Sequence, residues 1–211
     1  MDTILIYIIG ILGGYLLGSI PFGFLIGRAC GVDVRTVGSK NIGATNVYRT
    51  VGKGWGFLAF ACDFLKGLAP TLVAKGVASS VGADPALVHL PLAVGVACVA
   101  GHTLTVFMKF KGGKGVATAF GMLIGLTPLL VLSAFALFVA TVALSHYISL
   151  GSCLSAAFLA VAVWIPFAPL GSLGYRDLPL CVLVTLISVF VIVKHRSNIR
   201  RLLAGNENKI F

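Results

Sequence analysis

The sequence predicts an all-α integral membrane protein with seven transmembrane helices, some short or broken, an external N-terminus and a cytoplasmic C-terminus. Of its 211 residues, 58% are hydrophobic and only 10% are charged, and the mean hydropathy is +1.04. Apolar stretches of about 20 residues, which are typical of transmembrane helices, recur along the chain. The basic residues cluster in short segments beside these stretches, as the positive-inside rule predicts. We therefore expect one transmembrane domain over residues 1–211, without a second soluble domain.

The apolar stretches lie at residues 4–27, 55–78, 87–108, 116–145, 151–169 and 178–194. The first stretch lacks a preceding basic segment and is long enough to remain as a span, so a cleaved signal peptide is not expected. Its glycines Gly10, Gly14 and Gly18 recur every four residues, which favours close helix packing in lipid. Pro21 is expected to kink or loosen its cytoplasmic end.

The number of spans follows from the positions of the basic segments. Residues 28–55 and the tail after Val193 are both rich in Lys and Arg, so both should be cytoplasmic. An external N-terminus and a cytoplasmic tail require an odd number of spans. The six apolar stretches give seven spans if the stretch 116–145 is broken near Pro128. The piece before Pro128 is about 12 residues or 18 Å long, shorter than the ~30 Å hydrocarbon core. Short, broken spans of this kind usually line a cavity or a site.

Charge and cysteine content exclude several classes of function. The net charge of +10 lies in short loops without interleaved aromatic residues, so nucleic acid is not an expected partner. The five cysteines form no CxxC pair, so we interpret them as small buried hydrophobes rather than as metal ligands or disulfides. Paired carboxylates and His/Cys clusters are absent from the sequence, so no metal or cofactor is expected.

A polar, basic and glycine-rich segment at residues 38–54 interrupts the apolar pattern and contains no carboxylate. Its hydroxyls, amides and glycines suit an anion-binding turn, and an arginine suits phosphate oxygens. The residues concerned are Ser39, Asn41, Gly43, Thr45, Asn46 and Arg49. We interpret the segment as a phosphate-recognising loop at a membrane surface. An ordinary cytoplasmic loop, basic only because of its topology, is the alternative.

A second basic, glycine-rich segment at residues 109–118 leads directly into an apolar helix. A phosphate there would meet both lysine ammonium groups and the N–H dipoles of the helix start. The residues concerned are Lys111, Gly112, Gly113, Lys114 and Thr118. A nucleotide-binding P-loop is excluded, because Met108 and Gly115 stand where that motif needs Gly and Ser or Thr.

Asp63, Lys66 and His102 are ionisable residues within the predicted spans. Asp63 and Lys66 are three residues apart, so they can meet on one helix face. They either form an ion pair that tethers the helix end or help to position an active site. We interpret His102 as a hydrogen-bonded residue that supports the site rather than as a catalyst.

The C-terminal tail places His195 and Asn198 three residues apart, on one face of a continuing helix. As an alternative, they cap the helix or extend to the membrane surface. The expected topology brings the segments 38–54, 109–118 and 195–207 to one cytoplasmic side, where they can hold two phosphate groups. Such a site supplies positioning and charge stabilisation, which suits an already activated substrate. A covalent acyl-serine at Ser39 is poorly supported, because no base is adjacent in sequence.

The motif residues are 38–49, 111–118 and 195–207, with further matches at 18–21, 63–67 and 149–152. They resemble those of a bacterial family, the membrane-embedded acyl-phosphate:glycerol-3-phosphate acyltransferases (the PlsY family), over nearly the whole chain. The resemblance implies a single transmembrane acyltransferase domain over residues 1–211 in the bacterial cytoplasmic (inner) membrane, with its active site on the cytoplasmic side. It implies transfer of a fatty acyl group from acyl phosphate to the 1-hydroxyl of glycerol 3-phosphate. The products are lysophosphatidate and inorganic phosphate, in the first step of phospholipid biosynthesis.

By position, the resemblance implies catalytic roles for Ser39, Arg49, Lys114, His195 and Asn198. The acyl-donor phosphate would be held by Ser39, Thr45 and Asn46 with the Gly43 backbone. Arg49 and Lys114 would bind glycerol 3-phosphate, and His195 and Asn198 would complete the site. The other expected substrate-binding positions are Asn41, Lys111, Gly112, Gly113, Thr118 and Glu207. The expected partners are acyl phosphate, glycerol 3-phosphate and membrane lipid, with the enzyme active as a monomer and without metal or cofactor.

Two other functions stay open from the residues alone. A transporter of a phosphorylated solute would also use broken helices and anion-binding loops, although here the polar segments crowd one side of the membrane. A lipid-scaffolding subunit would tolerate Ser39→Ala without loss of any turnover. For the enzyme, the resemblance implies that the substrate's own phosphate accepts the hydroxyl proton, with His195 as the alternative base.

Overall fold

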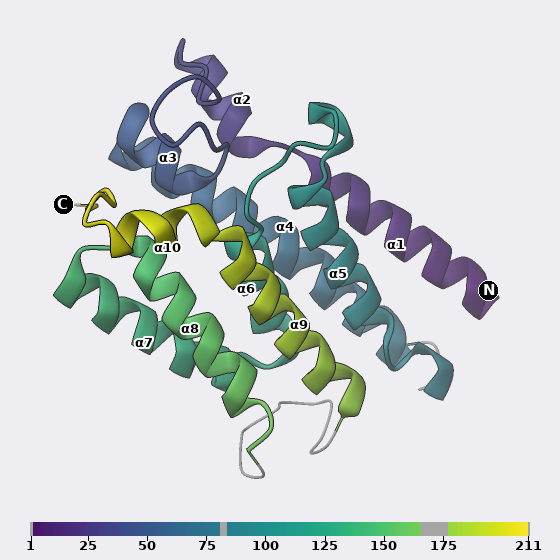
Figure 1. Cartoon of the computed structure of the whole chain (residues 1–211). Helices are drawn as coiled ribbons and strands as arrows, with labels where there is room; N and C mark the ends of the chain where they lie inside the picture. The colour runs from purple at the N-terminus through teal and green to yellow at the C-terminus, as the bar shows by residue number, and fades with distance from the viewer. Residues whose placement is uncertain (1, 81–83, 166–176, 211) are drawn as a thin grey trace. The chain divides into compact units, whose positions relative to one another are not determined.

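The computed structural model describes residues 2–80, 84–165 and 177–210, and every regular element in these ranges is a helix (Figure 1). The chain divides into two compact units, Met1–Gly125 and Leu126–Phe211. The predicted all-α class is confirmed for the described residues. A single acyltransferase domain over residues 1–211 stays a prediction.

The first unit is built around helices that approach one another closely. It contains α1 (Thr3–Ser19), α2 (Phe22–Ala29), α3 (Ala44–Thr50), α4 (Lys53–Ser80), α5 (Leu90–Thr103) and α6 (Val116–Leu126), with 3₁₀ turns at Pro85–Leu87 and Val106–Met108. A Cβ atom at Gly18 would lie 2.2 Å from the carbonyl oxygen of Cys98. The glycine therefore lets the backbones of α1 and α5 touch, as the four-residue spacing predicted.

The first apolar stretch is interrupted at Pro21. Helix α1 ends at Ser19 and α2 begins at Phe22, so the expected kink is a full break in the helix. Side chains from elsewhere bind the carbonyl groups that the break frees. Lys66 Nζ donates to the carbonyl oxygen of Ile20 at 2.8 Å, and the Thr105 hydroxyl donates to that of Ser19. The break is thus compensated by hydrogen bonds, as a membrane environment requires.

The predicted break near Pro128 is confirmed, because α6 ends at Leu126 and α7 begins at Pro128. With 11 residues, α6 is shorter than the roughly 20 residues of a usual transmembrane helix. It lies directly against α4, since a Cβ atom at Gly67 would be 2.1 Å from the carbonyl oxygen of Thr118. Backbone contact of this kind leaves no room for a side chain between the two helices.

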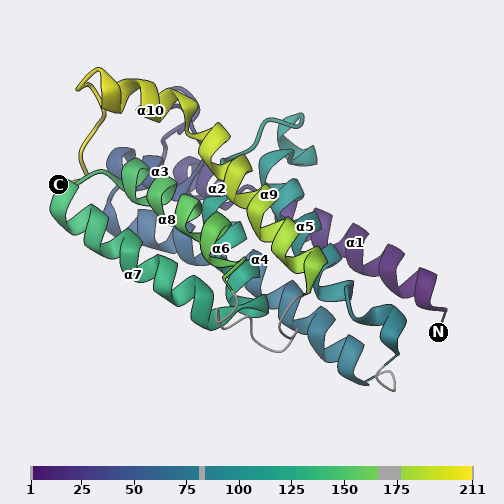
Figure 2. The same cartoon turned by 60° about the horizontal axis from the view of Figure 1, so that its bottom comes forward.

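The second unit contains α7 (Pro128–Ser145), α8 (Ile148–Ala162), α9 (Leu178–Lys194) and α10 (Arg196–Leu203). Figure 2 shows α7 and α8 side by side, and the Ser155 hydroxyl joins them by donating to the carbonyl oxygen of Ala134 at 2.8 Å. Helix α8 begins earlier than the expected span 151–169. The end of that span, and the glycines of both expected external turns (Gly82, Gly171 and Gly174), lie outside the described residues.

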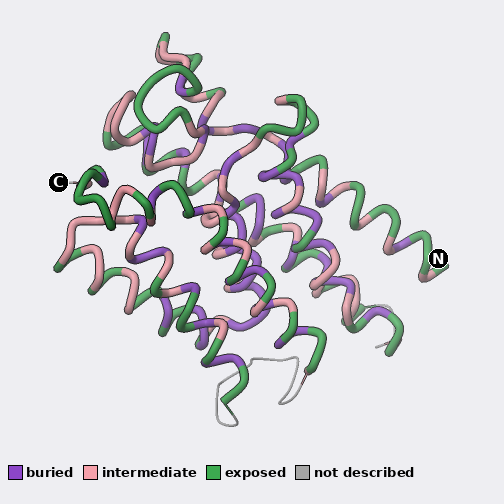
Figure 3. Tube along the Cα trace, viewed as in Figure 1, coloured by how far each residue is buried: buried purple, intermediate pink, exposed green. Residues whose placement is uncertain are grey.

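Within the described ranges, four helical segments are long and apolar enough to cross a membrane: Thr3–Ala29, Lys53–Ser80, Pro85–Met108 and Pro128–Ser145. Leu178–Lys194 with Arg196–Leu203 forms a further, bent candidate, and α6 and α8 are shorter apolar helices. In Figure 3, α1 shows a long exposed face. Its exposed side chains include Ile4 at 67% and Leu12 at 57%, and such an apolar surface suits lipid rather than water.

Candidate functional site

Asn46 organises the polar loop between α2 and α3. Its side-chain oxygen accepts the backbone N–H of Ser39 at 2.9 Å. Its amide nitrogen donates to the carbonyl oxygens of Val34 at 2.8 Å and Val37 at 3.2 Å. Asn46 was predicted to contact substrate. In the structure it is buried and holds the loop that presents Ser39, a role that its sequence position did not indicate.

Ser39 lies at the exposed tip of this loop. Its neighbours Gly38 and Lys40 have φ values of 58° and 56°, a left-handed conformation that costs energy at Lys40 because it has a Cβ atom. A Cβ atom at Gly38 would lie 2.3 Å from the Asn46 side-chain oxygen, so glycine is needed there. The tight turn holds the Ser39 hydroxyl away from the helices, where a ligand can reach it.

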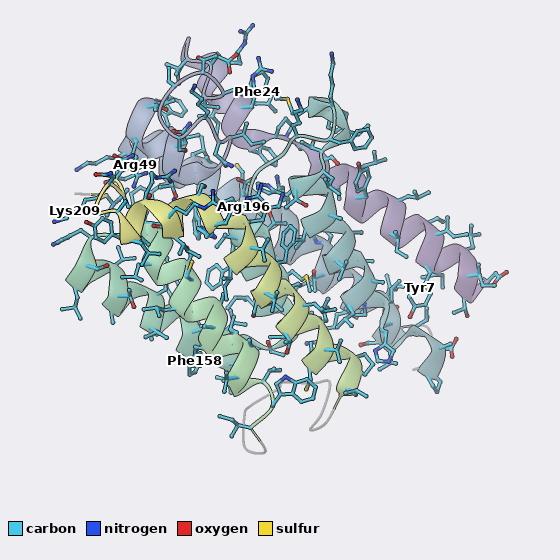
Figure 4. The ribbon with its side chains drawn as sticks, viewed as in Figure 1. Tyr7, Phe24, Arg49, Phe158, Arg196 and Lys209 are labelled. Atoms are coloured by element: carbon cyan, nitrogen blue, oxygen red, sulfur yellow. The ribbon has the colours of Figure 1, made fainter. Side chains whose placement is uncertain are left out.

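Arg35, in the same loop, is already paired. Its guanidinium lies 2.6 Å from the Asp33 carboxylate and 4.5 Å from the centre of the Phe24 ring, which Figure 4 labels. The hydrogen bonds from Arg35 lower the pKa of Asp33 to about 2. This cation is therefore committed to the loop's own structure.

Helix α3 carries Thr45 and Arg49, and two further predicted residues, Asn41 and Gly43, lie just before it. Gly43 precedes its first turn, and the Gly43 N–H donates to the Asn41 side-chain oxygen at 2.8 Å. That N–H is thus engaged within the loop rather than open to a phosphate. Thr45 and Arg49 are four residues apart on α3, so they share one helix face. Figure 4 labels Arg49.

The second glycine-rich segment connects α5 to α6. The N–H groups of Gly112 and Gly113 donate to the carbonyl oxygens of Thr103 at 3.2 Å and His102 at 3.0 Å. Both N–H groups are therefore used inside the protein. Lys114 follows directly, and α6 begins at Val116, so the predicted lysine at a helix start is confirmed.

Two other predicted residues flank this lysine. Lys111 is exposed, and Thr118 is fully buried in the first turn of α6. The Thr118 hydroxyl oxygen has no hydrogen-bond partner among the described residues. A buried hydroxyl of this kind is costly unless a ligand or water satisfies it.

Asp63, Lys66 and His102 form a buried cluster. Lys66 Nζ lies 2.7 Å from Asp63 Oδ1, which confirms that the two side chains meet on one face of α4. His102 Nδ1, on α5, lies 3.5 Å from the same carboxylate oxygen. The contact of His102 was missed, because no sequence signal shows which residues of two long helices face each other.

Glu207 is the centre of a hydrogen-bonded network in the second unit. Its carboxylate accepts from Ser149 Oγ at 2.9 Å, Asn198 Nδ2 at 2.6 Å and Arg201 Nε at 2.6 Å. Burial raises the pKa of Glu207, but these three hydrogen bonds outweigh it, so the pKa lies below its ordinary value. The carboxylate joins the tail to α8 and α10. Ser149 and Arg201 were not among the predicted site residues.

His195 lies at the junction of α9 and α10, which meet at 55°. The expectation of one continuing helix is wrong, because the chain bends at His195. The N–H of Ile199 still donates to the carbonyl oxygen of His195 at 2.8 Å, so His195 and Asn198 lie within one helical turn. His195 Nδ1 lies 2.8 Å from the carbonyl oxygen of Val191, and a carbonyl can only accept. Nδ1 therefore carries a hydrogen, which leaves Nε2 as the basic nitrogen of a neutral ring.

Each unit thus carries a distinct part of the predicted set. The first unit holds Ser39, Asn41, Gly43, Thr45, Asn46, Arg49, Lys111, Gly112, Gly113, Lys114 and Thr118. The second unit holds His195, Asn198 and Glu207. Within the first unit, the structure links Asn46 to Ser39; within the second, it links Asn198 to Glu207.

Comparison with known proteins identifies the family. The family model described as glycerol-3-phosphate acyltransferase matches residues 8–205. A glycerol-3-phosphate acyltransferase of Geobacter sulfurreducens is 51% identical over 196 residues, which cover 92% of this chain and 93% of the relative. One from Trichlorobacter lovleyi is 48% identical over 200 residues, covering 94% of this chain and 95% of the relative.

Solved structures agree with these relatives. The chain matches a crystal structure of PlsY (YgiH), an integral membrane glycerol 3-phosphate acyltransferase in its glycerol 3-phosphate form, with a TM-score of 0.82 and 37% identity. The match covers 96% of this chain and 94% of that chain. The lysophosphatidic acid form of the same enzyme matches with a TM-score of 0.79 and 36% identity. The chain described here belongs to the glycerol-3-phosphate acyltransferase family of integral membrane enzymes.

Proposed function

We propose that this enzyme transfers a fatty acyl group from acyl phosphate to the 1-hydroxyl of glycerol 3-phosphate. The hydroxyl oxygen attacks the carbonyl carbon, and the bond between that carbon and the bridging phosphate oxygen breaks. The products are lysophosphatidate and inorganic phosphate. The observation that carries the proposal is the pair of basic, glycine-rich segments that lead into α3 and α6 in a chain of this family. The related PlsY enzyme has been crystallised in glycerol 3-phosphate and lysophosphatidic acid forms, which match both sides of this reaction.

An acyl-phosphate donor suits the surroundings of Ser39. Among the described residues no hydrogen bond to the Ser39 hydroxyl is present, and the structure gives it no histidine or carboxylate partner. A serine without a neighbouring base is a poor covalent nucleophile. Acyl phosphate is a mixed anhydride with a good leaving group, so direct transfer between the two substrates needs no acyl-serine. Ser39 would then hold the donor phosphate by hydrogen bonding.

The donor phosphate would be held by the α2–α3 loop and the start of α3. Ser39 and Thr45 supply hydroxyls, while Asn41 and Gly43 shape the turn through their mutual hydrogen bond. Asn46 acts by holding the Ser39 backbone. Hydrogen bonds to a phosphate that gains charge as it leaves stabilise the transition state.

Glycerol 3-phosphate would be held by Arg49 and Lys114. A guanidinium binds phosphate oxygens in a bidentate manner, and a lysine beside a helix start adds a second positive charge. Lys111 would raise the local positive potential from its exposed position, and the glycines Gly112 and Gly113 would hold Lys114 in place. Thr118 offers its unpartnered hydroxyl to the same ligand.

The attacking hydroxyl must lose its proton as the new ester bond forms. We favour transfer to a phosphate oxygen of the substrate itself, with His195 Nε2 as the alternative acceptor. The Val191 carbonyl fixes the ring in the tautomer that has a basic Nε2. Asn198 is held by Glu207 and would orient a substrate oxygen beside it.

We further propose a seven-span topology in the bacterial cytoplasmic membrane, with an external N-terminus and the site on the cytoplasmic side. Thr3–Ala29 would be the first span, and α4, Pro85–Met108, α6, α7, α8 and α9 would be the others. The break between α6 and α7 supports this odd number. The protein would act as a monomer.

The test uses purified protein in detergent with acyl phosphate and glycerol 3-phosphate, and follows phosphate release and lipid product together. We expect one lysophosphatidate per phosphate released, and no product when acyl-CoA replaces acyl phosphate. Phosphate release without lipid would mean hydrolysis and contradict the proposal. Uptake of glycerol 3-phosphate into vesicles without esterification would point to a transporter instead.

A further inference from the structure

We propose that His102, held by the buried ion pair of Asp63 and Lys66, is a positioning residue that determines where Lys114 stands during glycerol 3-phosphate binding. The inference rests on the proposed function, because it takes Lys114 as a ligand of that substrate. His102 acts through the backbone of Gly112 and Gly113 and does not itself touch the substrate.

The ion pair is a structural anchor that the proposed reaction does not use. The side chains of Asp63 and Lys66 are 3% and 4% exposed, and their charged atoms lie 2.7 Å apart. Lys66 also donates to the carbonyl oxygen of Ile20 at the break between α1 and α2. Buried charges in an apolar helix are costly and persist only when they are paired. The pair therefore fixes the Asp63 carboxylate at a defined point between the helices.

His102 is the partner of that carboxylate on α5. Its Nδ1 lies 3.5 Å from Asp63 Oδ1, and its side chain is 5% exposed. This separation exceeds that of a strong hydrogen bond, and apart from the ion pair with Lys66 neither atom has a hydrogen-bond partner among the described residues, so the contact is a close electrostatic approach of two buried polar atoms. The carboxylate thereby orients the imidazole ring, with Nδ1 toward α4.

The opposite side of the ring faces the glycine-rich segment. A Cβ atom at Gly113 would lie 2.1 Å from His102 Nε2, and one at Gly112 would lie 2.0 Å from the carbonyl oxygen of His102. The Gly113 N–H donates to that carbonyl oxygen at 3.0 Å. The two glycines thus lie flat against His102, and neither position has room for a side chain.

Lys114 is fixed by anchors on both sides of it in the sequence. Gly113, the residue before it, rests on His102, and α6 begins two residues later at Val116. The first turns of α6 are in turn held against α4 at Gly67. A shift of the imidazole ring would therefore move the backbone of Lys114. A misplacement of about 1 Å can reduce a rate by about 100-fold.

The test compares two substitutions of His102. The side chain of His102→Asn is shorter but can still direct an amide donor toward Asp63, whereas that of His102→Leu cannot. We expect His102→Leu to raise the KM for glycerol 3-phosphate about tenfold, with kcat and the KM for acyl phosphate changing less than about twofold. His102→Asn should recover most of this loss. Equal effects of the two variants, or equal changes in both KM values, would overturn the inference.

A second measurement asks whether His102 acts through Lys114. In a Lys114→Ala background, His102→Leu should raise the KM for glycerol 3-phosphate by less than about twofold, because coupled residues are not additive. If Lys114→Ala alone leaves this KM unchanged, the role of Lys114 in the proposed function is wrong and the positioning inference fails with it. If Lys114→Ala raises it and His102→Leu does not, only the positioning inference fails.

Two further variants guard against loss of folding. The double substitution Asp63→Leu with Lys66→Met removes both charges and the acceptor oxygen together, which avoids an unpaired buried charge. It should raise the KM for glycerol 3-phosphate about as much as His102→Leu does. Lys75→Met is the matched control, because Lys75 lies on the same helix but contacts the carbonyl oxygen of Gly125. A rise in KM for Lys75→Met equal to that of the double variant would also overturn the inference.

Discussion

The side chain of Asn46 binds the backbone of Ser39, with 2.9 Å between the Asn46 side-chain oxygen and the Ser39 nitrogen. The same amide donates to the carbonyl oxygens of Val34 and Val37. One buried side chain thus closes the polar loop on itself, and the exposed serine depends on it for its position. The effect of Asn46 on catalysis should therefore be indirect.

Asn46→Ala is expected to lower kcat/KM for acyl phosphate by about 10- to 100-fold, because the loop loses the hydrogen bonds that hold Ser39. The midpoint of thermal unfolding in detergent should fall as well, since three backbone groups each lose a hydrogen bond to Asn46. The measurement is steady-state phosphate release at varied acyl phosphate. Thr50→Val is the control, because Thr50 donates to the Asn46 backbone but does not touch Ser39. An unchanged kcat/KM in Asn46→Ala would show that Ser39 is held by other means.

Arg49→Ala and Lys114→Ala should each raise the KM for glycerol 3-phosphate by about 10- to 100-fold, since a charge-assisted bond to phosphate contributes about 1.5–3 kcal/mol. The effect should be smaller on the KM for acyl phosphate. Lys53→Ala is the control, because Lys53 is an exposed cation at the start of α4. If Lys53→Ala raised the KM equally, binding would depend on general positive charge rather than on these two side chains.

Glu207→Gln should lower the midpoint of thermal unfolding at pH 7. The folded pKa of Glu207 lies below its ordinary value, so its carboxylate stabilises the fold above about pH 4.3, the pKa of an unfolded glutamate. This contribution is lost as the pH falls through the folded pKa. The difference between the wild type and Glu207→Gln should therefore shrink below about pH 4. A difference that stayed constant with pH would exclude an ionic role, and Arg200→Gln, an exposed neighbour, should show neither effect.

Gly67→Ala should destabilise the protein by about 1–3 kcal/mol, because the new methyl group would collide with the backbone of Thr118. Gly76→Ala is a matched control on the same helix, since a Cβ atom at Gly76 has nothing within 4 Å. That control should be neutral or slightly stabilising. Chemical or thermal unfolding in detergent distinguishes the two, and similar values for both would mean that α4 and α6 can separate without cost.

The sequence predicted the helical segments because their signals are local. Hydropathy located the apolar stretches, and proline positions located both helix breaks, at Pro21 and near Pro128. The stretch 116–145 was divided into two spans because the cytoplasmic placement of both basic segments requires an odd number of spans. No single local signal required this division. The order of the motif residues predicted the family, which the relatives confirm.

The partners of individual side chains were harder to predict. The hydrogen bonds of Asn46 to the loop were not predicted, because sequence patterns show residue types and not hydrogen-bond partners, and its expected contact with substrate stays a prediction. The Glu207 carboxylate accepts a hydrogen bond from Ser149, which lies 58 positions away in the sequence. Such a contact depends on how the helices pack. The bend at His195 was also missed, since neither glycine nor proline marks it.

The backbone contact between α4 and α6 has a consequence for how the family can diversify. Neither Gly67 nor the Thr118 carbonyl offers a side chain that mutation can trim or enlarge. Evolution therefore has little means of widening or narrowing this crossing without breaking it. Engineers who seek a new chain-length preference should keep this crossing unchanged and vary residues elsewhere.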